Sequence, residues 1–151
     1  AMKRTDIIFI TRANLCDEKK LESLKNEILK ISEKKVFLCE LLIKEFENLK
    51  TGENYNRDCF HNKEVCAFCG IGNPLSFKAL LEKNNIKVKK FLKFPDHFRY
   101  SQKTFKKFQD GVYLTTEKDA VKIRGFAGEN IFSVKTEVKF DDNIVKNFLQ
   151  V

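Results

Sequence analysis

The sequence has no apolar run approaching the roughly 20 residues of a membrane-spanning helix. No signal-peptide pattern stands near its start, and it contains neither internal repeats nor low-complexity segments. Histidine occurs only twice. The absence of a long apolar run and of internal repeats argues against a membrane-spanning helix and against a repeat protein. The scarcity of histidine makes the position of each one informative.

The composition predicts a folded chain. Of the 151 residues, 42% are hydrophobic and 15 are Phe, enough for one core with a small satellite lobe. Helix-length and strand-length segments alternate, which favours an α/β fold over an all-β fold. The net charge of +8 is typical of a chain with an anionic partner, such as nucleic acid, a phosphorylated ligand or an acidic membrane surface. Five cysteines without a secretory signal predict reduced thiols in a cytosolic setting.

Hydrophobic patterning divides the chain into elements. The run 6–11 predicts a buried strand, Asp17 begins a helix with one apolar face, and 36–43 predicts a second strand. The polar stretch 44–63 predicts a linker and is the best candidate domain boundary. The later predicted elements are a strand at 65–69, a helix after 74, a strand at 86–94, a helix at 104–109, a strand at 112–115, a helix beginning at 116–119, a strand at 130–134 and a terminal helix at 144–149.

The stretch Gly70-Ile-Gly-Asn-Pro74 joins a predicted strand to a predicted helix. Asn73 is a favoured N-cap, and Pro74 suits a first helical turn. The glycines would let the backbone approach a ligand at the helix N-terminus, but the third glycine of a dinucleotide fingerprint is absent. A tight turn is therefore favoured over a ligand site.

Cys66 and Cys69, with Cys59 and His61 upstream, suggest a zinc site. If 65–69 is a strand, side chains three residues apart point to opposite faces and cannot share a metal. We therefore expect no metal site here and interpret the cysteines as small buried apolar residues.

The stretch Thr116-Glu-Lys-Asp119 follows a predicted strand and resembles a capping box, with Asp119 replacing the usual Glu or Gln. Capping accounts for Thr116 and Asp119 and leaves Glu117 and Lys118 free. These two stand at the carboxyl end of a strand, where α/β proteins bind ligands, although the structural role is favoured.

Lysines alternate with apolar residues along the predicted strand 86–94. The apolar face comprises Ile86, Val88, Leu92 and Phe94, and the basic face comprises Lys87, Lys89 and Lys93, with Lys90 beside them. A solvated edge strand is the favoured interpretation, because lysine protects sheet edges against aggregation. Contact with lipid or nucleic-acid phosphate is the alternative, and the nucleic-acid option is weakened because no base-stacking aromatic motif is evident.

Asp96 and His97 follow that strand and Pro95, which places them on a loop. Neighbours in sequence rarely face each other, so His97 would need an acid from elsewhere to fix its tautomer and raise its basicity. The residues alone leave two interpretations open, an ordinary loop histidine or a catalytic one.

Three motifs together resemble the tetraacyldisaccharide 4'-kinase family, whose members phosphorylate the lipid A disaccharide precursor with ATP. They are Ala67-Phe-Cys-Gly-Ile-Gly-Asn-Pro74, Phe94-Pro-Asp-His97 and Thr116-Glu-Lys-Asp-Ala-Val-Lys122, in the family's order and separation. Ile10-Thr-Arg-Ala13 resembles a fourth family element. The similarity covers nearly the whole chain, but only the C-terminal half of such an enzyme.

The resemblance implies a fragment of a P-loop-type α/β kinase. Residues 1–43 would be the tail of the nucleotide domain, 44–63 a linker that forms a two-stranded hairpin, and 64–151 a small C-terminal α/β domain. The phosphate-binding pattern G-x-x-x-x-G-K-S/T does not occur in the 151 residues, nor does the family's N-terminal membrane-associating segment. We therefore expect ATP and Mg²⁺ to bind mainly to the missing N-terminal half, and the fragment alone to be soluble and inactive.

The resemblance also implies a reaction and a site. The full-length enzyme would transfer the γ-phosphate of ATP to the 4'-hydroxyl of the tetraacyldisaccharide 1-phosphate precursor, at the anionic cytoplasmic face of the inner membrane and without a nucleic-acid partner. His97 would be catalytic, orienting or polarising an aspartate of the P-loop domain that acts as base, and Asp96 would support it. Thr116, Glu117 and Lys118 would face the interdomain cleft.

The rival hypothesis is a non-catalytic basic α/β module that binds nucleic acid or a protein partner. Tight, salt-sensitive binding of RNA or DNA, without lipid-kinase activity in the intact parent protein, would favour it. An upstream P-loop in the intact parent would favour the kinase.

Overall fold

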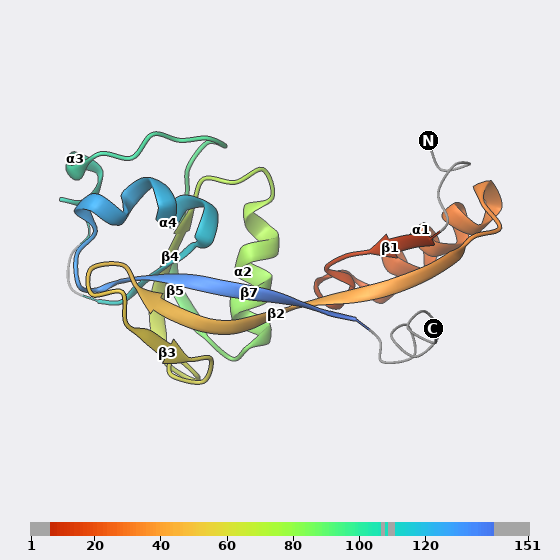
Figure 1. Cartoon of the computed structure of the whole chain (residues 1–151), viewed down its shortest axis with the longest axis horizontal. Helices are drawn as coiled ribbons and strands as arrows, with labels where there is room; N and C mark the ends of the chain where they lie inside the picture. Colours follow the sequence, from red (N-terminus) through yellow and green to blue (C-terminus); the bar gives the residue numbers. More distant parts are fainter. Residues whose placement is uncertain (1–6, 107, 109–110, 141–151) are drawn as a thin grey trace, which may run out of the picture. The chain divides into compact units, whose positions relative to one another are not determined.

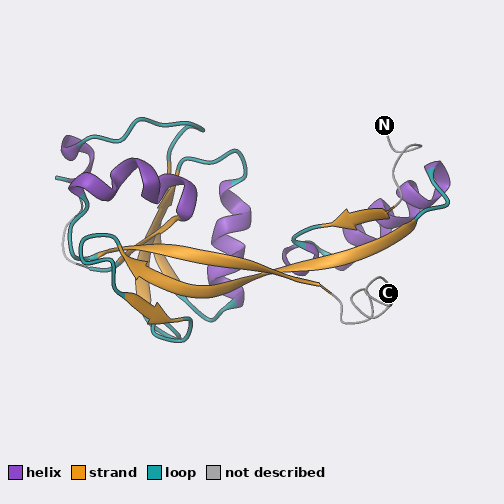
Figure 2. Cartoon of the chain, in the orientation of Figure 1, coloured by secondary structure: helices purple, strands orange, loops and turns teal. Residues whose placement is uncertain are grey.

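The computed structural model describes residues 7–106, 108 and 111–140. The chain forms two compact units, one of Ala1–Leu42 with Glu137–Val151 and the other of Ile43–Thr136. Figures 1 and 2 show their helices and strands. The elements are β1 (Ile7–Ile10), η2 (Ala13–Leu15), α1 (Glu18–Ile31), β2 (Lys35–Asn48), β3 (Asn54–Asn56), β4 (Glu64–Cys69), α2 (Pro74–Lys83), β5 (Lys87–Lys93), α3 (Gln102–Phe105), β6 (Tyr113–Thr116), α4 (Glu117–Ile123), η3 (Arg124–Phe126) and β7 (Ile131–Phe140).

The first unit is a β-α-β arrangement, in which α1 connects two parallel strands, β1 and the first part of β2. The Asp17 side chain accepts the Lys20 N–H at 3.3 Å, which confirms the predicted helix cap. In η2, which follows β1 in the chain, the Asn14 side chain makes two hydrogen bonds of 2.9 Å with the backbone of Leu41. The loop after β1 is therefore fastened to the neighbouring strand.

The second unit is built on a sheet with the strand order β2-β7-β6-β4-β5, and β3 pairs with β2. The pairs β4–β5, β4–β6 and β6–β7 are all parallel. The central strands read as apolar runs, and Ala67, Phe68 and Leu114 are fully buried. This is the pattern of a parallel sheet covered on both faces, and it matches the predicted α/β class.

Helices cover both faces of this sheet (Figure 1). On one face, α2 packs Phe77 against Phe91 of β5, with ring centroids 6.4 Å apart. On the other face, α4 contributes Ala120 and Ile123 to a cluster that includes Phe68. Alternate residues of β4 and β5 thus supply two separate cores.

The prediction of one basic face along 86–94 is wrong, because the strand contains a bulge. The register passes from Val65 opposite Val88 to Cys66 opposite Lys90, so Lys89 is an extra residue. Beyond the bulge the alternation is reversed, which puts Lys93 on the same face as Val88, while Lys90 lies on the same face as Lys87. The strand carries exposed lysines on both faces.

The stretch 44–63 holds more regular structure than its polar composition predicts. The strand predicted to end at 43 continues to Asn48, because residues 45–47 pair antiparallel with β3. Phe46 packs on Phe60 with ring centroids 4.8 Å apart, and Phe60 packs on Phe132 of β7 at 5.1 Å. These aromatic contacts bury the side of the hairpin that faces β7.

The remaining differences from the predicted elements are small. The helix predicted at 104–109 is the single turn α3, which begins two residues earlier, and 107 and 109–110 lie outside the described residues. The predicted terminal helix at 144–149 also lies outside them. Among the helices that are described, none is both long and apolar enough to cross a membrane.

Candidate functional site

The three motifs meet at one edge of the sheet. Because β4, β5 and β6 are parallel, the segments that follow them, 70–74, 94–98 and the start of α4, emerge at the same carboxyl edge. This is where open α/β sheets place ligand-binding groups. The contacts between these segments define the candidate site.

Asp119 connects the first and third motifs. Its fully buried carboxyl group accepts the Gly70 N–H at 2.9 Å and the Thr116 hydroxyl at 2.8 Å, both on Oδ2. Lys122 Nζ donates to Oδ1 at 3.2 Å. One buried carboxyl group is thus satisfied by three donors, one from the segment after β4, one from β6 and one from α4.

The predicted capping box is half right. Thr116 caps α4 as predicted, because its hydroxyl oxygen accepts the Asp119 N–H at 3.2 Å. The Asp119 side chain does not close the box but reaches across to the backbone of Gly70. The same carboxyl oxygen accepts the Thr116 hydroxyl, so Asp119 joins the cap of its own helix to the end of the neighbouring strand.

Gly70 lies where the first and second motifs touch. A Cβ atom at this position would lie 3.0 Å from the Pro95 carbonyl oxygen, 3.0 Å from the Tyr100 hydroxyl and 3.3 Å from the Phe98 Cβ. The Phe94 N–H also donates to the Cys69 carbonyl at 2.9 Å. The close approach of the two loops therefore leaves little room for a side chain at this position.

Asp96 connects the second and third motifs. Lys118 Nζ lies 3.1 Å from Asp96 Oδ1, which also accepts the His97 backbone N–H at 3.0 Å. The Lys118 hydrogen bond, followed by that of the His97 backbone, lowers the pKa of Asp96 despite some desolvation. The sequence prediction that Lys118 is free is therefore wrong.

Glu117 is not free either. Its Oε2 accepts the backbone N–H and the hydroxyl of Thr136, at 3.2 and 3.3 Å. These bonds fasten the first turn of α4 to β7 across the adjacent β6. Glu117 thus has a structural contact, while Lys118 acts on the loop that carries His97.

His97 has an unusual backbone conformation and an exposed ring. Its φ of +59° lies in the left-handed region, and its side chain is 77% exposed. Ring Nε2 lies 3.9 Å from Asp96 Oδ2, too far for a hydrogen bond. Asp96 therefore holds the backbone of His97 and leaves the imidazole directed to solvent. This agrees with the expectation from the sequence that adjacent side chains rarely face each other.

Asp119, Tyr100 and Lys122 are site residues that the sequence argument missed. Burial and the adjacent Asp119 charge raise the pKa of the Tyr100 hydroxyl, and Lys122 Nζ lies 5.8 Å from the Tyr100 ring centroid. A usable signal exists in the sequence, because Asp119 shares a helix face with Ala120 and Ile123, both buried. A carboxyl group on such a face needs buried donors.

Cys66 and Cys69 lie in β4, the strand that leads into the first motif. Burial raises the pKa of the Cys69 thiol to about 11, and Cys66 is half-buried. The His61 ring instead lies 2.9 Å from the Asn85 amide. In the described part of the chain, no group of three or more His, Cys, Asp or Glu residues is placed to hold a metal ion.

Together these contacts place an exposed imidazole on a loop held by charged and backbone hydrogen bonds at the carboxyl edge of a parallel sheet. The class so defined is an α/β domain whose polar residues meet at the carboxyl edge of its sheet, the edge where such folds place ligand-binding groups.

The comparisons with known proteins identify the family. The model of the LpxK family, tetraacyldisaccharide-1-P 4'-kinase, matches residues 1–151. The chain belongs to the tetraacyldisaccharide 4'-kinase family.

Individual members of the family give the extent of the likeness. The chain is 38% identical over 103 residues to a tetraacyldisaccharide 4'-kinase of Aquifex aeolicus, covering 68% of this chain and 30% of that protein. It is 30% identical over 130 residues to a tetraacyldisaccharide 4'-kinase of Bdellovibrio bacteriovorus, covering 82% of this chain and 38% of that one. The matched part is thus well under half of the length of these relatives.

A solved structure is similar over nearly the whole chain. The crystal structure of Aquifex aeolicus LpxK in complex with ATP superposes with a TM-score of 0.55 at 25% sequence identity. The likeness covers 93% of this chain and 50% of that chain. It matches the mixed α/β fold described above and the expectation that this chain corresponds to part of a larger kinase.

Proposed function

We propose that this chain is the C-terminal part of a lipid kinase that transfers the γ-phosphate of ATP to the 4'-hydroxyl of the tetraacyldisaccharide 1-phosphate precursor of lipid A. Family membership supports the reaction class. The observation that carries the proposal is the exposed His97 on a loop held by Asp96 and Lys118, at the edge where three family motifs converge.

His97 is the catalytic residue that this chain contributes. Phosphoryl transfer depends mainly on positioning and on stabilising charge, so an imidazole that orients the base or polarises it is a useful contribution. The base is an aspartate of the P-loop domain, and His97 acts on it while the base takes the proton of the 4'-hydroxyl. Asp96 and Lys118 hold the backbone that presents the ring, and Thr116 and Glu117 fix the helix from which Lys118 projects.

ATP and Mg²⁺ bind, in this proposal, to the P-loop part of the enzyme. The 151 residues do not contain the phosphate-binding pattern G-x-x-x-x-G-K-S/T. When bound, Mg²⁺ neutralises charge on the phosphates. The domain assignment from the sequence also remains part of the proposal, with 1–43 as the tail of the nucleotide domain, 44–63 as linker and 64–151 as the C-terminal domain.

The intact enzyme acts at the cytoplasmic face of the inner membrane, where its lipid substrate resides. The exposed lysines of β5 support attraction to anionic lipid, although they lie on both faces of the strand. Reversing the charge of the four lysines should weaken binding of the intact enzyme to vesicles of anionic phospholipid and leave neutral vesicles unaffected. These four are Lys87, Lys89, Lys90 and Lys93.

A matched control reverses four exposed lysines of α1, which changes the net charge equally. They are Lys19, Lys20, Lys25 and Lys30. Equal loss of vesicle binding in both variants would show that net charge alone accounts for the effect. Unchanged binding in the β5 variant would refute the membrane role of this strand.

The proposed reaction is tested with the intact parent protein and the 151-residue chain side by side. Transfer of labelled phosphate from ATP to the tetraacyldisaccharide 1-phosphate is measured for both. The proposal predicts transfer by the intact protein and none by the chain alone. An intact parent that folds and binds ATP but does not phosphorylate this lipid would refute the proposal.

A further inference from the structure

The geometry points to Asp119 as the residue that positions the His97 loop, acting through Gly70. This inference rests on the proposed function only for its catalytic consequence, since the structural connection stands without it. Asp119 does not lie in the loop that it is proposed to hold; it lies on α4, fully buried at the carboxyl edge.

The first step of the connection is the fixed carboxyl group. Lys122 donates to Oδ1, and the Thr116 hydroxyl donates to Oδ2 from the preceding turn. Both donors belong to the beginning and body of α4, so they hold the side chain in one orientation relative to its own helix. The second acceptor site of Oδ2 then points at β4, where it takes the Gly70 N–H at 2.9 Å.

The second step leads from Gly70 to the loop with His97. Little room separates Gly70 from that loop, since a Cβ added there would lie 3.0 Å from the Pro95 carbonyl oxygen and 3.3 Å from the Phe98 Cβ. These two residues flank Asp96 and His97, and the Phe98 N–H donates to the Pro95 carbonyl at 3.1 Å. A displacement of Gly70 must therefore displace the turn that holds His97 in its left-handed conformation.

Lys118 is a second support for the same turn, and it also projects from α4. The helix thus holds the loop at two points, directly through Lys118 and indirectly through Asp119 and Gly70. The Lys118 contact is half-exposed, whereas the Asp119 contact is buried, so Asp119 contributes the less adaptable of the two supports.

The test uses the two histidines as reporters. The imidazole resonances of the 151-residue chain are recorded by NMR. Comparison with the spectrum of His61→Asn assigns each resonance to His97 or His61. His61 precedes β4, at the opposite edge of the sheet, and is the internal reference. Asp119→Ala removes the acceptor of Gly70, and it should shift the His97 resonances while those of His61 stay in place.

Asp119→Asn is the conservative variant. Its amide oxygen can replace Oδ2 and accept from Gly70 and Thr116, so the His97 resonances should stay close to those of the unaltered chain. Leu81→Ala is the matched control, because Leu81 is fully buried in the last turns of α2, away from the carboxyl edge. It lowers stability without touching the loop and should leave His97 unshifted. If the Ala variant does not fold, Asp119→Ser, whose hydroxyl is too short to reach Gly70, replaces it with the same expectation.

In the intact enzyme, Asp119→Ala should lower kcat about tenfold or more, with KM for ATP unchanged and with activity recovered in Asp119→Asn. A folded Asp119→Ala or Asp119→Ser chain with an unshifted His97, or an equal shift in Leu81→Ala or Asp119→Asn, would overturn the inference. If the His97 resonances shift but the His97→Ala enzyme is fully active, the connection between Asp119 and the His97 loop stands and the proposed function is refuted.

Discussion

Lys118 Nζ lies 3.1 Å from Asp96 Oδ1, so the first turn of α4 is joined by a charged hydrogen bond to the loop that follows β5. The two residues are 22 positions apart in the chain and belong to different family motifs. Their contact joins the motif that carries His97 to the motif that begins α4, so both motifs belong to the candidate site.

The first prediction concerns this pair. Lys118→Met in the intact enzyme removes the cation that holds Asp96 and allows the His97 loop to move. Because small misplacements of catalytic groups are costly, kcat should fall roughly 10-fold to 100-fold, with little change in stability. Steady-state kinetics and urea unfolding measure the two effects.

The matched control for Lys118→Met is Lys78→Met, which removes the cation of another exposed pair, with Glu82 at 3.4 Å on α2. It should leave kcat unchanged. A Lys118→Met enzyme with the turnover of the unaltered protein would show that Asp96 needs no cation beside it.

The second prediction concerns the contact between loops. Gly70→Ala places a methyl group 3.0 Å from the backbone oxygen of Pro95, which cannot move without disturbing the turn. The free energy of unfolding should fall by about 1–3 kcal/mol. Gly125→Ala, at a position where an added Cβ meets nothing within 4 Å, should be close to neutral. Urea denaturation curves of the two variants that coincide would be incompatible with the packing described at Gly70.

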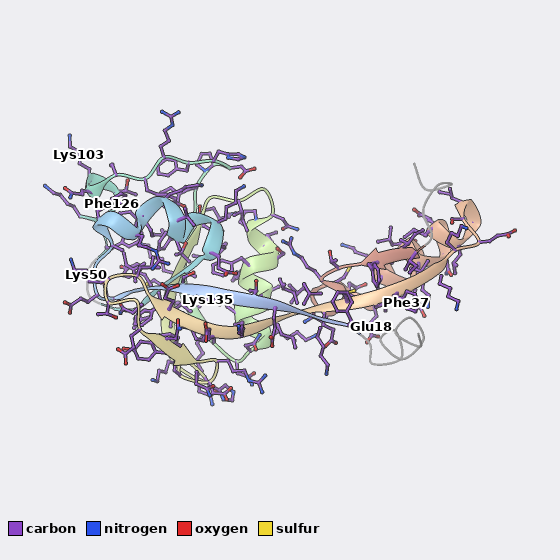
Figure 3. The ribbon with its side chains drawn as sticks, in the orientation of Figure 1. Glu18, Phe37, Lys50, Lys103, Phe126 and Lys135 are labelled. Atoms are coloured by element: carbon purple, nitrogen blue, oxygen red, sulfur yellow. The ribbon has the colours of Figure 1, made fainter. Side chains whose placement is uncertain are left out.

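The third prediction concerns a set of ion pairs between β2, β7 and η3. Arg124 pairs with Glu47, and Lys135 Nζ lies 3.3 Å from Glu47 and 3.2 Å from Glu45. Figure 3 labels Lys135 on β7. The Arg124 hydrogen bond, opposed by desolvation and assisted by Lys135, lowers the pKa of the nearly buried Glu47. Its charged form is therefore favoured in the folded state.

The pH dependence follows from that direction. A carboxyl group with a lowered folded pKa adds stability above its unfolded pKa of about 4.3, and this stability is lost as the pH falls through the folded value. The free energy of unfolding should decline from pH 5 downwards, and Glu47→Gln should make the decline shallower. Glu64→Gln, which alters an exposed pair with Lys89, should leave the pH profile unchanged. A Glu47→Gln profile parallel to that of the unaltered chain would contradict the assignment.

Local signals predicted the elements well. Asp17 and Asn73 cap α1 and α2 as expected, because a cap depends only on residues within one turn. The apolar runs predicted β4 and β6, and the family motifs led to a family that the comparisons confirm. The candidate site residues themselves remain predictions, although the structure brings their motifs together.

The errors have one physical origin, since each depends on a neighbour distant in the chain. Lys89 is an extra residue only because β5 pairs with β4, and no pattern within 86–94 reveals it. Lys118 appeared free because its partner Asp96 lies in another motif. Asp119 appeared to be part of a cap because the backbone of Gly70, 49 residues away, is not visible in a local pattern.

The turnover of His97→Ala in the intact enzyme tests the central claim most directly, with His61→Ala as the matched histidine control. Transfer of phosphate from ATP to the tetraacyldisaccharide 1-phosphate is followed at saturating concentrations of both substrates, with the folded state checked by circular dichroism. The account predicts that His97→Ala lowers kcat about 100-fold or more while His61→Ala keeps it. A folded His97→Ala enzyme with near-normal kcat would contradict the account.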